Sequence, residues 1–223
     1  MIINAVIPAK GNSERVANKN MFRIKNESLV HMACAKLLRT KTINKVYLDT
    51  DCDEIIYDVN DLRKEGLEII KRPIELANND ISANDLLIYA LHSMANCDLI
   101  IQTFATSPLI TANTIDNCIS KFLDQTNKND YDSFFTVIDM YEYFWKKDGD
   151  SFKPSNFDIK TLPNSFELLP IYMETHGLYG IFSKALIKYK TRVGEKPYLI
   201  QIPKSEAHDI NEYEDLTILE KLL

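Results

Sequence analysis

Short apolar runs alternate with amphipathic segments over the first two thirds of the chain. The apolar runs are four to six residues long, as expected for buried strands, and cover 2–7, 45–48, 67–70, 99–103 and 133–138. The segments between them carry apolar residues at helical spacing and predict helices over 29–38, 53–63, 85–94 and 114–125. Strands that alternate with helices predict an α/β fold, with a mostly parallel sheet and helices on both faces.

The segment after the first apolar run has the chemistry of a phosphate-binding loop. Gly11 lets the backbone approach an anion closely, and Ser13 offers a hydroxyl. Lys10, Arg15 and Lys19 supply positive charge. The spacing GxxxxGK[ST] of a Walker A loop is absent, and the segment holds too few glycines for a GxGxxG loop. Ligands of parallel sheets bind at the carboxyl ends of strands, so we expect this loop and the segment from Phe104 to meet over one pocket.

The pattern changes between residues 139 and 174. Aromatic residues crowd this stretch, and Asp148-Gly149-Asp150 has the composition of a tight turn, which favours a β-hairpin over another crossover unit. The insertion either packs on its own domain or forms a dimerisation arm, since aromatic residues are enriched at interfaces. We therefore expect one domain over 1–223, with 139–174 inserted in it.

Composition excludes several classes of protein. The 223 residues carry a net charge of −6, which argues against a general nucleic-acid binder. The four cysteines are scattered without metal-binding spacing, as in proteins of a reducing compartment. The first apolar run is too short for a secretion signal, and no run is long enough to cross a membrane. We expect a cytoplasmic protein with no membrane partner.

The order of residues in the loop resembles a family signature. Residues at six positions match PARxGSxRxxxKN, the signature of the acylneuraminate cytidylyltransferase family: Pro8, Ala9, Ser13, Arg15, Lys19 and Asn20. Gly11 stands at a position that the signature leaves open, while Lys10 and Asn12 replace its arginine and glycine. Four further segments resemble the family in the same order, at 72–80, 106–109, 176–182 and 206–216. The ending Lys19-Asn20 favours this family over the related enzymes for 3-deoxy-manno-octulosonate.

The resemblance implies a Rossmann-like homodimer that couples CTP to an acidic, nonulosonic acid-like sugar with Mg²⁺, through catalytic roles for Lys19 and Asp209. It implies nucleotide contacts for residues of the loop and of two later segments, namely Ala9, Lys10, Gly11, Ser13, Arg15, Lys19, Asn20, Arg72 and, less directly supported, Ser82. It implies contacts with the acceptor for Phe104, Thr106, Ser107 and His176. The segment 139–174 then becomes the arm of the dimer.

The family's metal-binding aspartates correspond here to Asp209 and Asn211. Two residues one position apart on an extended segment project to the same side. Asn211 keeps a carbonyl oxygen but lacks the charge, and Mg²⁺ often needs only one or two carboxylates beside waters and phosphate oxygens. Alternatively, Asp209 caps the helix that begins near Glu212.

Departures from the family pattern keep other functions open. Phe104 and Ile110 replace polar or cationic family residues, and the segment 164–167 lacks the family's arginine. These changes predict a rebuilt acceptor half and leave open a relative that binds nucleotide without catalysis. Asp49-Thr50-Asp51 also resembles the DXD motif of metal-dependent glycosyltransferases, which is a further alternative.

Overall fold

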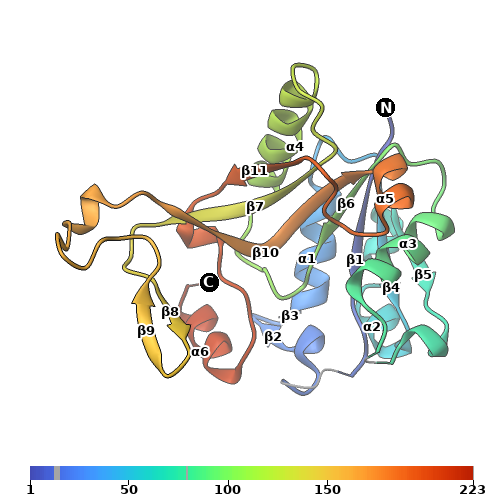
Figure 1. Ribbon diagram of the computed structural model, residues 1–223. Helices are drawn as coiled ribbons and strands as arrows, with labels where there is room; N and C mark the ends of the chain where they lie inside the picture. The colour runs from blue at the N-terminus through green and yellow to red at the C-terminus, as the bar shows by residue number, and fades with distance from the viewer. Residues whose placement is uncertain (13–15, 79, 223) are drawn as a thin grey trace.

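The computed structural model describes residues 1–12, 16–78 and 80–222, and it is built around one seven-stranded sheet (Figure 1). The order of its strands is β11-β7-β10-β6-β1-β4-β5. These strands are β1 (Ile3–Pro8), β4 (Lys45–Thr50), β5 (Leu67–Lys71), β6 (Leu99–Thr103), β7 (Ser133–Met140), β10 (Ile171–Phe182) and β11 (Pro197–Gln201). All neighbours are parallel except β10, which runs antiparallel to both β6 and β7. The predicted α/β, Rossmann-like sheet is confirmed.

Helices cover both faces of this sheet, as predicted. They are α1 (Leu29–Leu38), α2 (Asp53–Asp58), α3 (Ala83–Ser93), α4 (Ala112–Thr126), α5 (Ser183–Tyr189) and α6 (Tyr213–Leu222). Buried side chains of α1, α2, α4 and α6 form one core with one face of the sheet. Those of α3 and α5 form a second core on the other face. Each core buries aliphatic surface, which is the main favourable term in folding.

Local sequence explains where several helices begin and end. The side chain of Ser28 accepts a hydrogen bond from the backbone N–H of His31 and caps α1, which spans the predicted residues. The helix predicted over 53–63 is shorter: α2 ends at Asp58, and a 3₁₀ turn (Leu62–Glu65) follows. Val59 and Asn60 lie between the two, and both residue types have low helix propensity.

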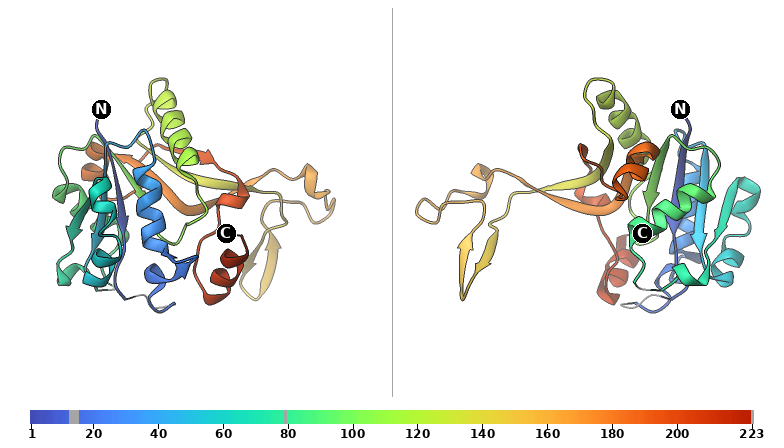
Figure 2. Two further views of the ribbon diagram at one scale, coloured as in Figure 1. Left: turned by 180° about the vertical axis from the view of Figure 1, so that it is seen from behind. Right: turned by 45° about the vertical axis from the view of Figure 1, so that its right-hand side comes forward.

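The segment from residue 139 to 174 extends away from the sheet (Figure 2). It contains the predicted hairpin, formed by the antiparallel strands β8 (Trp145–Asp148) and β9 (Ser151–Pro154), with Gly149 at φ +59° in the turn. Phe157 packs against the rings of Tyr143 and Trp145, at centroid distances of 5.0 and 5.3 Å. A smaller hairpin of β2 (Arg23–Ile24) and β3 (Glu27–Ser28) precedes α1. The long ends of β7 and β10 carry the insertion.

The cysteines are not joined to one another. All four cysteines are free thiols, and Cys34 and Cys118 are buried in the core. In the ranges that the structure covers, no helix is both long and apolar enough to cross a bilayer.

A buried ion pair joins the carboxyl ends of β4 and β5. The side chains of Asp49 and Arg72 are 1% and 2% exposed, and Arg72 Nε and Nη2 donate to the two carboxylate oxygens at 3.0 and 2.8 Å. Arg72 Nη2 also donates to the backbone carbonyl of Asp49 at 3.0 Å. That carbonyl accepts a further hydrogen bond from the backbone N–H of Ala9. The pair therefore fixes the carboxyl ends of three strands that are neighbours in the sheet, β1, β4 and β5.

We expect Asp49→Ala to lower the free energy of unfolding by about 3–5 kcal/mol, because it leaves the buried guanidinium of Arg72 without its counter-charge. Chemical denaturation with circular dichroism measures this loss. Arg63→Ala, at an exposed position of the turn before β5, is the control and should change stability by less than about 0.5 kcal/mol. A loss of comparable size in both variants would contradict the role of the buried pair.

Candidate functional site

Two adjoining pockets lie at the carboxyl ends of the central strands. The first, pocket A, has a volume of about 240 Å³. Its lining combines the loop after β1 with Phe104 and the segment around α3: Pro8, Lys10, Arg72, Leu76, Ala77, Asn78, Ile81, Ala83, Leu86 and Phe104. The expectation that the loop and the Phe104 segment meet over one pocket is confirmed. Most of this lining is apolar, as in pockets that hold a flat ring.

The second, pocket B, has a volume of about 200 Å³ and shares Phe104 with pocket A. It brings together six residues that the sequence places in the site, from four separate segments: Lys19, Phe104, Thr106, His176, Asp209 and Asn211. Ile210 and Arg192 complete the lining. One aromatic ring thus separates two hollows, each with its own polar groups.

An irregularity in β10 brings His176 to pocket B. The pairing of β10 with β7 shifts register between Glu174 and Tyr179, so that β10 carries extra residues at this point. His176 sits there with φ +56°, a left-handed conformation that is uncommon for residues other than glycine. Its Nδ1 lies 3.1 Å from the hydroxyl of Tyr179 and 3.3 Å from Oε1 of Glu174. The hydroxyl of Tyr179 also bonds to Glu174, and burial followed by this bond raises the pKa of Tyr179. The tyrosine therefore stays protonated and holds the Glu174 carboxylate beside the pocket.

The carboxylate of Asp209 is one wall of pocket B. Asn211 Nδ2 donates to its Oδ2 at 2.9 Å, so the two side chains project to the same side, as predicted. Oδ1 is shielded from solvent and accepts no hydrogen bond from the residues that the structure describes. Asp209 is not the helix cap: the carboxylate of Asp215 accepts from the backbone N–H groups of Asn211 and Glu212, at 2.7 and 2.8 Å. The capping alternative for Asp209 is wrong because Asp215 satisfies these donors.

Lys19 ties the loop after β1 to this segment. Its Nζ donates to the backbone carbonyl of Ile210 at 2.8 Å, and the side chain is half-buried. An isolated phosphate-binding lysine would be expected to be exposed before its ligand arrives. Here it has a protein partner, so its substitution also removes a contact between distant segments. The ammonium still lines pocket B beside Asp209.

Several residues of the loop position the backbone. Ala9 is fully buried, and Asn20 Nδ2 donates to the carbonyl of Lys10 at 2.9 Å, which closes the loop on itself. The backbone N–H of Gly11 donates to Asp51 Oδ1 at 3.2 Å. A Cβ on Gly11 would lie only 2.8 Å from Cβ of Cys52, so this close packing requires glycine at the position. Ser13 and Arg15, which the sequence assigns to the nucleotide, lie outside the described residues.

Three other residues that the sequence assigns to the substrates make contacts that stabilise the fold. Arg72 is buried and lines pocket A, and its Nε and Nη2 donate hydrogen bonds to Asp49. The hydroxyl of Ser82 caps α3 in a reciprocal pair with Asp85 and does not line either pocket. Ser107 is 2% exposed, and Lys36 Nζ donates to its carbonyl at 3.2 Å. Ser107 therefore helps to hold the segment after β6 in place and lines neither pocket.

The DXD alternative conflicts with the geometry at the end of β4. The Asp49 carboxylate is buried against Arg72, and that of Asp51 accepts from the N–H of Gly11. In the described ranges, no cluster of three or more His, Cys, Asp or Glu side chains has the arrangement of a metal site. Both aspartates hold the loop in place, which accounts for the motif without a metal.

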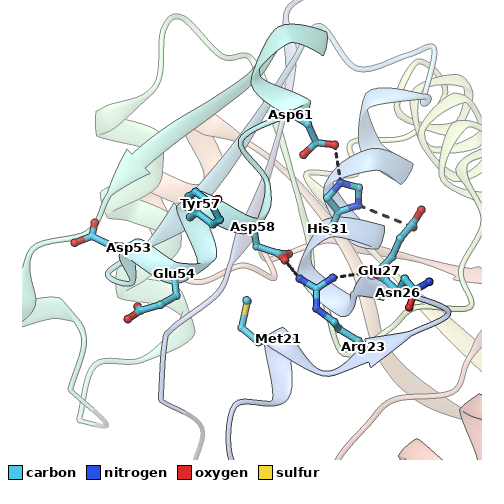
Figure 3. A pocket seen from close by; sticks show the side chains of 10 residues that line it. All are labelled: Met21, Arg23, Asn26, Glu27, His31, Asp53, Glu54, Tyr57, Asp58 and Asp61. Atoms are coloured by element: carbon cyan, nitrogen blue, oxygen red, sulfur yellow. Dashed lines mark hydrogen bonds and ion pairs between the residues drawn. The ribbon is translucent and has the colours of Figure 1, made fainter.

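A larger hollow, about 800 Å³, lies between α1, α2 and the small hairpin (Figure 3). Arg23 pairs there with Asp58, and His31 Nε2 lies 3.1 Å from Asp61 Oδ2. Its remaining charged side chains are the carboxylates of Glu27, Asp53 and Glu54. Five carboxylates against one arginine and one histidine repel a triphosphate. None of the predicted site residues lines this hollow, so we place no substrate in it.

Arg192 is the residue of pocket B that the sequence does not reveal. It lies on the loop between α5 and β11, and its guanidinium carbon is 4.1 Å from the ring centroid of Tyr179. No motif surrounds it, and its place in the site depends on contacts with side chains far away in sequence. The segment 164–167, where the sequence lacks an expected arginine, lines neither pocket.

Comparison with protein families and curated proteins gives consistent matches. A family model described as cytidylyltransferase matches residues 4–211. The chain is 24% identical over 231 residues to a 3-deoxy-manno-octulosonate cytidylyltransferase of Thermodesulfovibrio yellowstonii, which covers 99% of this chain and 87% of the relative. It is 24% identical over 206 residues to N-acylneuraminate cytidylyltransferase A of Danio rerio, covering 91% of this chain and 46% of the relative. The 3-deoxy-manno-octulosonate and N-acylneuraminate cytidylyltransferases therefore match this chain at the same sequence identity.

Solved structures share the fold over the whole chain. A 4-diphosphocytidyl-2C-methyl-D-erythritol synthase from Anaerococcus prevotii superposes with a TM-score of 0.73 at 13% identity, covering 99% of this chain and 95% of that one. A CMP:2-keto-3-deoxy-manno-octonic acid synthetase, solved in complex with CTP, has a TM-score of 0.67 at 14% identity, covering 100% and 98%. At these identities the likeness establishes the fold.

Proposed function

The chain belongs to the cytidylyltransferase family, and we propose that it couples CTP to a small acidic sugar, giving a CMP-activated sugar and pyrophosphate. The observation that carries this proposal is the pair of pockets divided by Phe104. Six residues that the family resemblance assigns to the site line pocket B, although they come from segments as far apart as Lys19 and Asn211. Their convergence supports one working site.

Pocket A suits the nucleoside and pocket B the reacting groups. The apolar lining of pocket A, between Pro8 and Leu86, can enclose a pyrimidine ring, and Lys10 supplies charge beside it. Arg72 Nη1 remains for a contact with the base, since its other nitrogens are bonded to Asp49. The acceptor enters pocket B, where Thr106 and His176 offer polar contacts.

The reaction needs positioning and charge compensation more than a covalent nucleophile. A hydroxyl oxygen of the acceptor attacks the α-phosphorus of CTP, a new P–O bond forms, and the P–O bond to pyrophosphate breaks. The acceptor's proton passes to solvent. Lys19 stabilises the negative charge that develops on the phosphates, as a charge-assisted donor already held beside Asp209.

Mg²⁺ fits the donor set of pocket B. Oδ1 of Asp209 is a shielded carboxylate oxygen without a hydrogen bond from the described residues, and Asn211 adds an amide oxygen. One or two protein oxygens beside substrate phosphates are a common way to hold this cation. Asp209 and Asn211 would hold it, and when bound it would neutralise phosphate charge.

The proposed function predicts a preference for one nucleotide. In isothermal titration calorimetry with Mg²⁺, CTP should bind at least tenfold more tightly than UTP, ATP or GTP, because one pocket encloses the base. Equal binding of all four, or of none, would contradict the proposal. Tight binding of a UDP-sugar or GDP-sugar would favour a glycosyltransferase. CTP binding without pyrophosphate release from any sugar acid would identify a non-catalytic relative.

The proposed function also predicts that turnover depends on the carboxylate of Asp209. Asp209→Asn keeps the shape of the side chain and removes its charge, so turnover should fall at least about a hundredfold at saturating CTP. Pyrophosphate release, measured across Mg²⁺ concentrations, gives the result. Asn211→Asp should lower the Mg²⁺ concentration needed for half-maximal rate. Asp124→Asn, exposed on α4, is the matched control and should behave as wild type. Unchanged turnover in Asp209→Asn would remove this residue from the site.

We also propose that the arm, residues 139–174, joins two copies of the chain. Large apolar side chains are exposed along it, including Trp145, Phe152, Phe166, Leu169 and Tyr172. Exposed apolar surface of this extent marks an interaction site. Analytical ultracentrifugation should find a dimer, and Phe152→Lys should shift it towards monomer. Tyr57→Lys, at a position 85% exposed outside the arm, should leave the mass unchanged. A monomeric wild-type protein would refute this assembly.

A further inference from the structure

We propose that Arg192 binds the carboxylate of the acidic acceptor and thereby selects acids over uncharged sugars. This inference rests on the proposed function, because it names the group that recognises the second substrate of the same site. Four observations carry it: the position of the guanidinium, its unused donors, its support by aromatic rings, and the anchoring of its loop.

The guanidinium lies over the aromatic wall of pocket B. Its central carbon is 4.1 Å from the ring centroid of Tyr179 and 5.9 Å from that of Phe104. Arginine stacks on aromatic faces through cation–π attraction, and such stacking leaves the N–H groups at the edge of the plane available. Its position over Tyr179 therefore leaves the guanidinium donors of Arg192, which lines pocket B, available to a ligand there.

Those N–H groups have no hydrogen-bond acceptor in the described part of the chain. The nearest carboxylate is that of Glu174, whose Oε1 lies 3.9 Å from Nη2, too far for a hydrogen bond. Glu174 is instead bonded to the hydroxyl of Tyr179. It compensates the charge of Arg192 without occupying its donors. A planar fork of donors matches the two oxygens of a carboxylate.

The backbone around Arg192 is fixed before any ligand binds. Its N–H donates to Oδ1 of Asn84 in α3 at 3.0 Å. Two residues further on, the N–H of Gly194 donates to Oγ of Ser133 at 2.9 Å, and the carboxylate of Asp132 accepts from the N–H of Glu195 at 2.8 Å. A donor held in place loses little freedom on binding, which favours affinity and discrimination.

Pocket B has a second cation, but it is placed differently. Lys19 Nζ is bonded to the carbonyl of Ile210, beside Asp209 and the expected phosphates. Arg192 approaches from the loop before β11, and its guanidinium lies over the ring of Tyr179 on the antiparallel strand β10. The two cations thus suit two different anions, the triphosphate and the acceptor acid.

The experiment compares acids with their esters. Two probes are used with CTP and Mg²⁺, 3-deoxy-manno-octulosonate and N-acetylneuraminate, each as the free acid and as the methyl ester. Steady-state pyrophosphate release gives KM and kcat for whichever acid turns over, and competition against that reaction gives the affinity of its ester. The variants are Arg192→Ala, Arg192→Lys and Arg192→Met, with Arg63→Ala as the matched arginine control. Arg192→Met keeps the aliphatic stem over Tyr179 and guards against loss of folding.

Arg192→Ala and Arg192→Met should raise the KM of the acid roughly 10- to 100-fold, the loss expected for hydrogen bonds to a charged group. The KM of CTP should change less than threefold. Binding of the methyl ester should hardly change, so that the variants lose the preference of wild type for the acid. Arg192→Lys should fall between, because it keeps the charge and loses the planar fork.

Three results would overturn this assignment. The first is a wild-type protein that binds CTP but prefers neither acid over its ester. The second is an increase in the KM of CTP, rather than of the acid, in the Arg192 variants. The third is a lower kcat in these variants with no change in the KM of the acid. Failure of wild type to bind CTP would instead refute the proposed function itself, and the role of Arg192 with it.

Discussion

The buried ion pair of Asp49 and Arg72 is the constraint on which the rest of the site depends. A charged pair removed from water is tolerated only when its hydrogen bonds are complete, and here both carboxylate oxygens and one carbonyl accept from the guanidinium. The same residue, Asp49, receives the N–H of Ala9 as the chain leaves β1. Asp51, two positions on, holds the N–H of Gly11. The loop after β1 therefore begins from a backbone fixed by neighbouring strands.

Sequence periodicity predicted the parallel half of the fold closely. Strand β6 and helix α1 span the residues that their apolar patterns indicate, because β6 is buried along its whole length and α1 packs a regular set of residues into the core. The antiparallel strand β10 and the edge strand β11 have no such signal. β10 is partly exposed where it leaves the sheet and irregular at His176, so its residues do not alternate regularly between core and solvent. Topology here follows from pairing between distant segments, which no local pattern records.

The site was predictable to the extent that short motifs describe it. Lys19, His176 and Asp209 stand in recognisable segments and meet in pocket B. Arg192 stands in none, since its position depends on stacking against Tyr179, which only the folded chain provides. Conversely, Ser82 belongs to a recognisable region but serves as a helix cap, because a serine before a helix satisfies the same short patterns whether or not a ligand lies near.

In the function that we propose, the division of the site by Phe104 separates two tasks. Pocket A is bordered by the carboxyl ends of β1, β5 and β6 with α3. Pocket B is bordered by the segment after β6, the antiparallel strand, the segment before α6, Arg192 and Lys19 of the loop after β1. Changes of acceptor can therefore accumulate in pocket B without disturbing the packing of the loop against β4. This arrangement accounts for a chain that keeps the loop signature while its acceptor half departs from the family pattern.

Strand β10 links the arm to the site by a single continuous backbone. It pairs with β7 at Ile171, near the C-terminal end of the arm, and with β6 at Phe182 in the middle of the sheet. Glu174, His176 and Tyr179 lie between these two points. The register shift between Glu174 and Tyr179 lies on this same stretch of backbone. The strand that carries the arm, which we propose joins two copies of the chain, therefore also carries three residues at or beside pocket B.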